Sequence, residues 1–414
     1  MNNKRLVVVT GIGAVTPIGS GTGRGLYEGV RRERSAITRV TRFDPSPYSS
    51  QVAGEVADFD PAAYIEPRRL RRLDRYAQMA VVCARLAIDD AGLRLEDEDR
   101  DAIGCFVGSA LGGAAFAEEQ YGVFLTQGPR RIRPQLALSV FCGAGSCNVA
   151  IEYDLRGPAS ANSDSCSSGA IAIGHAFRVV RDGYADVMLA GGIEAPLAPL
   201  IFGAFDVIHA MSTHNDEPDR ACRPFDRTRD GFVMAEGGAL LVLEALEHAR
   251  RRGAPIYGTV LGYGLSNDAH HMTAPLPSGA QAARVMRLAL AEAGIAAEDV
   301  DHINAHGSST PLNDATETLA IRQVLGEHAY RIPVSATKAM HGHSLGAAGA
   351  IEAAICFLGL RHGYVPPTLN LQEPDEACDL DYVTDHGREM PLRHVMSNSF
   401  GFGGINASLV FGAA

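Results

Sequence analysis

The sequence predicts an α/β fold made of two similar halves, stacked with a layer of helices between them. The first observation is an internal repeat, in which residues 85–93 (RLAIDDAGL) resemble residues 287–295 (RLALAEAGI) at an offset of 202 (287 − 85). Each copy is typical of an amphipathic helix that ends at a glycine, and an acidic linker and an apolar strand follow it. A duplicated domain explains this recurrence, although short alanine-rich helices can also resemble one another by chance.

Short apolar segments supply the second observation. Most of them do not alternate between apolar and polar residues, which indicates strands that are buried on both faces and lie in sheets between helices. The strand candidates are residues 6–10, 103–107, 187–191, 239–243, 256–261, 300–305, 395–400 and 407–411.

Two helices rich in glycine and alanine supply the third observation. They open with CSSGA at residues 166–170 and with HSLGA at residues 343–347, an offset of 177 (343 − 166). Helices with small side chains on every face can be buried on all sides, so we expect both between the sheets. No flexible linker separates the halves, and we place their boundary so that residues 1–254 form the first half and residues 255–414 the second.

Composition excludes several classes of protein. The chain has 414 residues, 46% of them hydrophobic and 21% charged, which is normal for a folded protein. A net charge of −11 argues against nucleic-acid binding. The longest apolar runs, such as residues 237–246, are too short to span a membrane, and the apolar run at residues 6–9 is too short for a secretory signal. We therefore expect a soluble cytoplasmic protein.

No cofactor or metal site is predicted. The eight cysteines form no CxxC pair, so free thiols in a reducing compartment are expected. Gly11 and Gly13 follow the first strand, but Thr16 stands where a dinucleotide-binding loop needs its third glycine, so we interpret them as a tight turn at the strand end. His270 and His271 are adjacent and without ligand partners at suitable spacing, which favours a structural or substrate-lining role.

Cys166 differs from the other cysteines because it lies in a polar turn, SDSCSSGA, that opens a buried helix. Free N–H groups and the helix dipole at such a position are expected to lower the pKa of the thiol. The same N–H groups can stabilise an oxyanion. The turn therefore predicts a nucleophile.

Two histidines occupy comparable turns in the second half. His306 follows an apolar strand, and His343 precedes the second glycine- and alanine-rich helix, with Lys338 nearby. An imidazole at a helix N-terminus has a lowered pKa and donates a hydrogen bond as the neutral form. Near the C-terminus, residues 398–406 (NSFGFGGIN) indicate a strand–turn–strand with an aromatic gate, which includes Phe400, Gly401 and Phe402.

These motifs resemble the thiolase-fold β-ketoacyl-acyl carrier protein synthases, most closely those of the synthase II type. The resemblance extends over essentially the whole chain, through residues 7–13, 157–158, 186–192, 223–232, 305–310, 338–346 and 398–406. It implies a thiolase-like five-layer αβαβα sandwich and an acyltransferase that elongates a fatty acyl chain. The reaction is the decarboxylative condensation of an acyl thioester with malonyl-acyl carrier protein, and it needs no cofactor.

The resemblance also implies residue roles. Cys166 corresponds to the nucleophile, and His306 and His343 to the pair that binds the malonyl carbonyl. Lys338 and Glu317 correspond to an ionic pair, and the N–H groups of Cys166 and Phe402 to the oxyanion hole. Phe402 corresponds to a gate, Leu111 to the entrance of the acyl pocket, and Ser308 and Thr310 to hydroxyls that contact pantetheine.

Two basic clusters, residues 68–72 (RRLRR) and 130–133 (RRIR), stand out in an acidic chain. On a helix, arginines at this spacing share a face, which indicates either a solvated surface or a docking patch. Both clusters coincide with positions at which the resembled family docks its acidic carrier protein. The resemblance therefore implies docking by Arg69, Arg72, Arg130 and Arg131.

Several positions depart from the synthase II pattern. Asp164-Ser165 precedes the nucleophile, where a carboxylate could oppose thiolate formation, and His341, Ile405 and Ser308 replace other residues. Residues 134–143 (PQLALSVFCG) also differ, in the region of the dimer seam. A homodimer is expected, but the ketosynthase subunit of a type II polyketide or polyene synthase, paired with a chain-length factor, stays open as the alternative. A non-catalytic scaffold and a thiolase fit less well, because Cys166, His306 and His343 are all present.

Overall fold

The structure, a computed structural model, describes residues 4–414 and is built on one continuous sheet of eleven strands. Strand β2 (Gly19–Thr22) pairs only with β1, and two short hairpins, β3 (Ile37–Arg39) with β4 (Val52–Gly54) and β12 (Tyr364–Val365) with β13 (Arg388–Glu389), lie apart from the sheet. The other strands follow one another in the order β11 (Val334–Ser335), β10 (His302–Asn304), β14 (His394–Gly401), β15 (Ile405–Gly412), β9 (Gly258–Asn267), β1 (Val7–Thr16), β8 (Gly237–Ala245), β7 (Val187–Glu194), β5 (Ile103–Gly108) and β6 (Ala159–Asn162).

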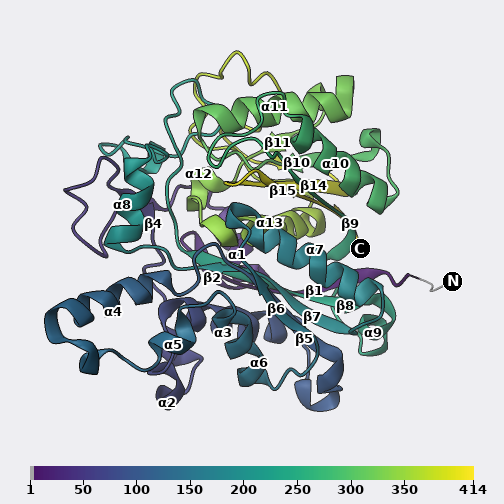
Figure 1. The fold of residues 1–414 in the computed structure, drawn as a ribbon. Coiled ribbons are helices and arrows are strands. Elements are labelled where there is room, and N and C mark those ends of the chain that lie inside the picture. The colour runs from purple at the N-terminus through teal and green to yellow at the C-terminus, as the bar shows by residue number, and fades with distance from the viewer. Residues whose placement is uncertain (1–3) are drawn as a thin grey trace.

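The helices complete five layers, as predicted (Figure 1). Helices α3 (Arg75–Asp90) and α6 (Ala144–Tyr153) cover the outer face of the first half, and α10 (Ala280–Ala293) and α11 (Pro311–Leu325) that of the second. Helices α7 (Ser168–Arg181) and α13 (Ala348–His362) form the inner layer. The remaining helices are α1 (Gly23–Val30), α2 (Pro67–Leu70), α4 (Ala114–Gln127), α5 (Leu136–Ser139), α8 (Pro199–Val207), α9 (Leu246–Arg251) and α12 (Lys338–His341).

The two halves are joined more closely than two stacked sheets require. Strand β1 is antiparallel both to β8 and to β9, and its pairing with β9 runs over Val7–Val9 opposite Val260, Thr259 and Gly258. This pairing makes the strands of both halves hydrogen-bonded neighbours in one sheet. The division at residue 254 stays a prediction.

The first strand is longer than predicted. Gly11 and Gly13 lie inside β1 and not in a turn at its end. A Cβ atom at Gly11 would lie 2.2 Å from the Ala87 carbonyl oxygen, and one at Gly13 would lie 2.1 Å from the Cys83 carbonyl oxygen. These glycines therefore allow α3 to pack directly on the strand, which explains their spacing without a nucleotide.

The inner helices cross at small residues and reveal the pseudosymmetry of the fold. A Cβ atom at Gly169 would lie 3.0 Å from the Ala350 Cβ, and one at Gly349 would lie 2.9 Å from the Ala170 Cβ. The helices also begin alike, each after a 3₁₀ turn, at Ser165–Ser167 and at Leu345–Ala347. The structural offset is therefore 180 (345 − 165), and the offset of 177 taken from the sequence motifs is wrong by three residues.

Residues Leu345–His362 are the one stretch between residues 4 and 414 that is long and apolar enough to cross a membrane, with a mean hydropathy of 1.2 over 18 residues. The sequence analysis overlooked it. Because 89% of this stretch is buried inside the protein, it is explained as a core helix. All eight cysteines lie in the described part of the chain and carry free thiols, as predicted.

Candidate active site

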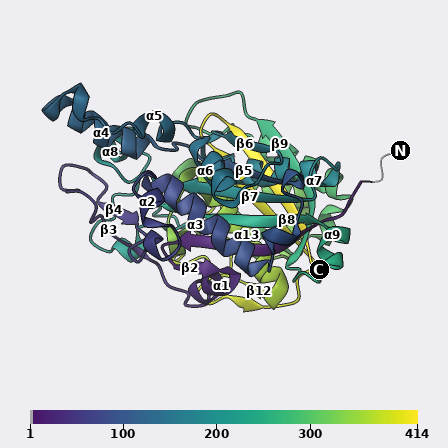
Figure 2. The ribbon, with the colours of Figure 1, turned by 90° about the horizontal axis from the view of Figure 1, so that it is seen from below.

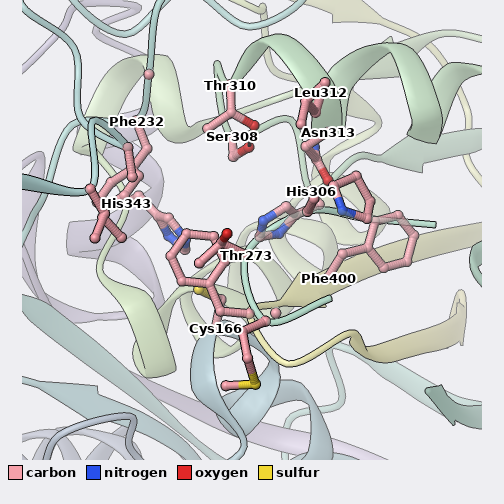
Figure 3. A pocket seen from close by; sticks show the side chains of 18 of the residues that line it. Cys166, Phe232, Thr273, His306, Ser308, Thr310, Leu312, Asn313, His343 and Phe400 are labelled. Carbon is pink, nitrogen blue, oxygen red and sulfur yellow. Dashed lines mark hydrogen bonds between the residues drawn. The ribbon is translucent and has the colours of Figure 1, made fainter. Parts of the chain in front are cut away.

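One cavity of about 340 Å³ gathers most of the side chains singled out in the sequence (Figure 3). Cys166 enters it from the start of α7, His306 from the end of β10 and His343 from the turn before α13. The other predicted residues that line it are Ser308, Thr310, Phe400, Gly401 and Phe402. The two halves of the protein thus contribute different chemistry to one site.

Cys166 lies in a sharp turn and is buried. The preceding Ser165 has a φ of 53°, a left-handed conformation that is uncommon for residues with a side chain. Burial raises the pKa of the Cys166 thiol, although the Ser165 hydroxyl, the Phe402 backbone N–H and the Lys338 charge oppose this effect. The prediction of a lowered pKa is therefore wrong, because desolvation of the buried thiol outweighs these three contributions.

Asp164 does not oppose the thiol in the way its position in the sequence suggested. Its carboxylate accepts a 2.7 Å hydrogen bond from the Asn162 side chain, and its backbone N–H donates to the Ser168 hydroxyl. Ile405, another departure, contributes its carbonyl oxygen, which accepts a 2.7 Å hydrogen bond from the Ser167 hydroxyl. Both unusual residues are therefore accommodated around the nucleophile turn.

His306 and His343 face one another across the cavity with their ring centroids 5.3 Å apart. Burial and the Lys338 charge hold the pKa of both imidazoles well below the usual value. The predicted neutral form is confirmed, although burial and not the helix N-terminus is the main cause. Two neutral rings can each donate an N–H to a thioester carbonyl oxygen.

Lys338 lies behind His306, outside the cavity lining. Its ammonium donates to the His306 carbonyl oxygen and forms a buried ion pair with Glu352 of α13. The pairing of Lys338 with Glu317 expected from the resemblance is therefore wrong. Glu317 accepts 2.9 Å hydrogen bonds from the backbone N–H groups of His306 and Gly307, which fixes the histidine turn instead.

Glu352 was missed by the sequence analysis. It is the only acidic residue in α13, whose other residues are apolar up to Leu360, and that isolation is the signal that could have found it. Buried charges are normally paired, so a lone glutamate in a core helix predicts a cation nearby. The sequence does not show that the cation is a lysine 14 residues earlier on another helix.

The predicted gate lies at the end of β14 and in the turn that leads to β15. The Phe402 ring stacks on Phe205 of α8 at 6.4 Å, and the Phe400 ring lies 6.0 Å from His306. The Phe402 backbone N–H is directed to Cys166, which fits an oxyanion hole shared with the Cys166 N–H. Movement of these rings as a gate stays a prediction.

The remaining predicted substrate residues divide into two groups. The hydroxyls of Ser308 and Thr310 lie 2.9 Å apart on the cavity wall. Leu111 does not line the cavity but packs against the apolar cluster that contains Cys166 and Phe202.

His341, the departure beside the catalytic loop, is buried against the Thr337 hydroxyl, and burial lowers its pKa to about 3. It therefore adds no charge to the site.

Family comparisons agree with this geometry. The model of the β-ketoacyl synthase N-terminal domain matches residues 4–249, and that of the C-terminal domain matches residues 257–372. The chain belongs to the β-ketoacyl synthase family. It is 46% identical to 3-oxoacyl-[acyl-carrier-protein] synthase 2 of Coxiella burnetii, with 98% of each chain covered. The synthase 2 of a Synechocystis species is 45% identical, with 99% of this chain and 98% of the relative covered.

Solved β-ketoacyl synthase structures share the thiolase-like fold. One is a type II polyketide synthase ketosynthase in complex with its acyl-carrier protein, with a TM-score of 0.92 and 37% identity over 99% of this chain and all of that one. Another is the ishigamide ketosynthase/chain length factor, with a TM-score of 0.93 and 38% identity over the same shares. Both 3-oxoacyl-[acyl-carrier-protein] synthases and a polyketide ketosynthase are thus among the relatives.

This β-ketoacyl synthase has further cavity residues that the sequence analysis did not single out for a role. Phe232 packs edge-on against the His343 ring at 5.3 Å, and Thr273 and Asn313 line the cavity (Figure 3). His271 also lines it, as a substrate-lining role predicts, whereas His270 does not. Among residues 4–414, no cluster of three or more potential ligands could hold a metal ion.

The two basic clusters are placed differently from one another. Helix α2 ends at Leu70, so Arg72 lies beyond it. The prediction that the arginines of the first cluster share one helical face is therefore wrong for Arg72. Arg69 is half-buried in an ion pair with Glu152 of α6 and donates to the Asn148 carbonyl oxygen. Arg72, Arg130 and Arg131 are exposed and form no ion pair with any described residue. They are therefore available to a partner, whereas Arg69 is committed to the fold.

Proposed function

We propose that the protein is a 3-oxoacyl-acyl carrier protein synthase that elongates an acyl chain held on Cys166. The observation that carries the proposal is the meeting of one thiol, two neutral imidazoles and the directed backbone N–H of Phe402 in a single cavity. A hydrolase needs a histidine that accepts a proton at neutral pH to activate water, whereas these buried imidazoles are suited to donate hydrogen bonds.

The first half-reaction transfers the acyl group. The Cys166 sulfur attacks the carbonyl carbon of the acyl thioester, and the N–H groups of Cys166 and Phe402 stabilise the oxyanion, a contribution of about 3 kcal/mol per donor. The carbon–sulfur bond to the carrier then breaks. The carrier leaves as a free thiol with the proton that Cys166 gives up.

The second half-reaction uses the histidines. Malonyl-acyl carrier protein places its thioester oxygen between His306 and His343, and their N–H groups stabilise the enolate as carbon dioxide leaves with cleavage of the carbon–carbon bond. That electron pair forms a new bond to the acyl carbon on Cys166. The thiolate of Cys166 is expelled and takes up one proton, so the balance requires no redox partner.

Intact-mass analysis of the purified chain is the direct test. Acyl carrier protein thioesters of several lengths are supplied, followed by malonyl-acyl carrier protein. We expect an acyl adduct on Cys166 and then the 3-oxoacyl product, and the length profile describes the pocket. Adduct formation on another residue, or none with any donor in any assembly, contradicts the proposal.

A second candidate is the ketosynthase subunit of a type II polyketide synthase that acts with a chain-length-factor partner. Two ketosynthases of polyketide or chain-length-factor systems are 37% and 38% identical to this chain. Helices α4 and α5, which project from the body at the end opposite the termini (Figure 2), and the residues beside them expose the side chains of Phe124, Leu125, Leu138, Val140 and Phe141. The edge strand β6 also has a free side.

A free strand edge and exposed apolar side chains fit a second subunit, either a copy of this chain or a chain-length factor. We propose the homodimer first. The two assemblies are distinguished by whether the chain alone forms the 3-oxoacyl product, which supports the homodimer. Acylation that stops without product until a second subunit is added supports the heterodimer.

The carrier protein is proposed to dock on Arg72, Arg130 and Arg131. Charge reversal at Arg131 is expected to raise the KM for acyl carrier protein about tenfold at low salt while sparing acylation by acyl-CoA, because only the carrier presents an acidic surface. Reversal at Arg69 serves as the contrast, since it breaks the ion pair with Glu152 and is expected to lower stability. An equal loss with both acyl donors at Arg131 contradicts docking.

A reducing cytoplasm is the proposed location. Eight free thiols, six of them buried, support it, because a reducing compartment keeps cysteines from forming disulfides.

A further inference from the structure

Glu194 is a fully buried carboxylate that neither half-reaction uses. It ends β7, and four donors surround it. One oxygen accepts from the Ser109 hydroxyl at 2.9 Å and the Leu111 N–H at 3.1 Å, and the other from the Ala110 N–H at 2.6 Å and the Gly346 N–H at 3.0 Å. Both oxygens are therefore fully occupied.

These donors come from two functional loops. Residues 109–111 follow β5 and carry Leu111, which packs beside Cys166, and the Ala110 carbonyl oxygen accepts a 2.9 Å hydrogen bond from Ser163 of the nucleophile turn. Gly346 lies three residues after His343, in the turn that opens α13. One carboxylate thus holds two segments in a fixed relation: the loop that carries Leu111, which the resemblance places at the entrance of the acyl pocket, and the histidine turn.

The pseudosymmetry shows what this arrangement replaces. At the offset of 180, Gly346 corresponds to Cys166. Strands β7 and β14 hold equivalent places in the strand order of the two halves, so their last residues, Glu194 and Gly401, correspond at an offset of 207 (401 − 194). A Cβ atom at Gly401 would lie 3.2 Å from the Cys166 backbone nitrogen. We call the turn that opens α7 (Ser165–Ser167) the first corner and the turn that opens α13 (Leu345–Ala347) the second corner. In the first corner the N–H of Cys166 lies beside a glycine. In the second corner the equivalent N–H, that of Gly346, is bound by the carboxylate of Glu194.

We infer that Glu194 is a positioning residue that permanently fills the counterpart of the oxyanion site and thereby couples the acyl pocket to the decarboxylation site. The inference deepens the proposed function and rests on it. Glu194→Gln keeps the size of the side chain but turns an amide NH₂ towards N–H donors, so at least one loop must move.

The experiment compares Glu194→Gln with Glu292→Gln. Glu292 is a matched control, because it is also a largely buried carboxylate, paired with Arg178 and Arg181 away from the cavity. Two readouts are taken: the acyl-length profile of Cys166 acylation, and carbon dioxide release from malonyl-acyl carrier protein in a Cys166→Gln background. Folding of each variant is checked by thermal unfolding.

We expect Glu194→Gln to change the ratio of short to long acyl adducts and to slow carbon dioxide release about 10- to 100-fold, the usual cost of displacing a reacting group by about 1 Å. Glu292→Gln should change neither. If Glu194→Gln does not fold, Ser109→Ala, which removes one donor, should shift the length profile in the same direction. An unchanged length profile, or unchanged carbon dioxide release, in the folded variant overturns the coupling. Absence of any adduct on the wild-type chain instead refutes the proposed function.

Discussion

The starts of α7 and α13 are built alike and do different work. Each follows a residue with a left-handed backbone, Ser165 with a φ of 53° and Leu345 with a φ of 44°, and each opens a glycine- and alanine-rich core helix. The first corner presents a thiol and leaves its N–H groups to the cavity. The second presents an imidazole, while Glu194 occupies the N–H at Gly346.

The difference shows how one duplicated scaffold supports two steps. The backbone geometry that creates a nucleophile turn is retained in both halves, but a carboxylate closes one of the two anion sites. Helix α13 also carries Glu352 in its core, whereas α7 has no acidic residue. The charge that organises the histidines therefore belongs to the second half alone.

Removing the thiol should have the largest effect. Cys166→Ala is expected to reduce condensation below detection, because it deletes the only cysteine among the residues that line the cavity. Cys166→Gln should retain or increase carbon dioxide release from malonyl-acyl carrier protein, since that step belongs to the other corner. Gas release and product formation are measured on the same preparations. Condensation by Cys166→Ala, or loss of gas release in Cys166→Gln, contradicts the division of labour.

Breaking the buried pair of the second half should come next. Lys338→Met leaves Glu352 unpaired in the core and is expected to lower the free energy of unfolding by about 3 to 5 kcal/mol, measured by denaturant unfolding. The double variant Lys338→Met/Glu352→Met should recover part of that loss, because two apolar residues replace the pair.

Double-mutant cycles show which of two glutamates, Glu352 or Glu317, interacts with Lys338. Coupling is expected between Lys338 and Glu352, with an interaction energy of about 1 to 3 kcal/mol. The cycle with Glu317 should show less, because Glu317 binds backbone N–H groups and not the ammonium. Stronger coupling to Glu317 would restore the pairing that the family resemblance implied.

A buried carboxylate outside both corners, Glu244, is expected to make the stability of the first half depend on pH. Glu244 of β8 accepts from Arg252 and from His248, which hold its pKa at about 2 despite burial. Hydrogen bonds to Glu244 and Glu98 raise the pKa of His248. The raised His248 pKa contributes stability below about pH 6.5 that is lost as the pH rises through the folded value, and Glu244 contributes stability above about pH 4.5 that is lost towards pH 2.

Thermal unfolding at a series of pH values tests this. His248→Gln should cost about 1.5 to 3 kcal/mol at pH 6 and less at pH 8. His175→Gln, a more exposed site whose pKa is lowered by burial, is the control and should not reproduce that slope. A cost that is the same at both pH values shows that the proton on His248 does not contribute.

The sequence predicted the reactive groups better than their partners. Cys166, His306 and His343 stand in polar turns beside apolar segments, so the local pattern makes them candidates, and the family resemblance implies their roles. Glu352, Glu194 and the Arg69–Glu152 pair depend on contacts between distant elements, which periodicity does not reveal. The Cys166 pKa was predicted in the wrong direction for the same reason, because burial is a property of the whole fold.

The smallest expected effect tests the glycine that distinguishes the first corner from the second. Gly401→Ala places a methyl group about 3.2 Å from the Cys166 nitrogen, closer than an ordinary contact, and crowds the oxyanion site without removing a donor. We expect kcat for condensation to fall about tenfold, less than the 100-fold or more typical of a lost oxyanion donor. Carbon dioxide release in the Cys166→Gln background should be unchanged, because it depends on His306 and His343.

The matched control is Gly122→Ala in α4, where a Cβ atom would meet nothing within 4 Å. It should leave both rates unchanged, which isolates crowding from the general effect of an added methyl group. Equal losses of condensation and gas release in Gly401→Ala indicate that the β14–β15 turn supports both corners. A loss confined to condensation means that the open N–H groups beside Gly401, the feature that Glu194 removes from the other half, serve the acyl thioester alone.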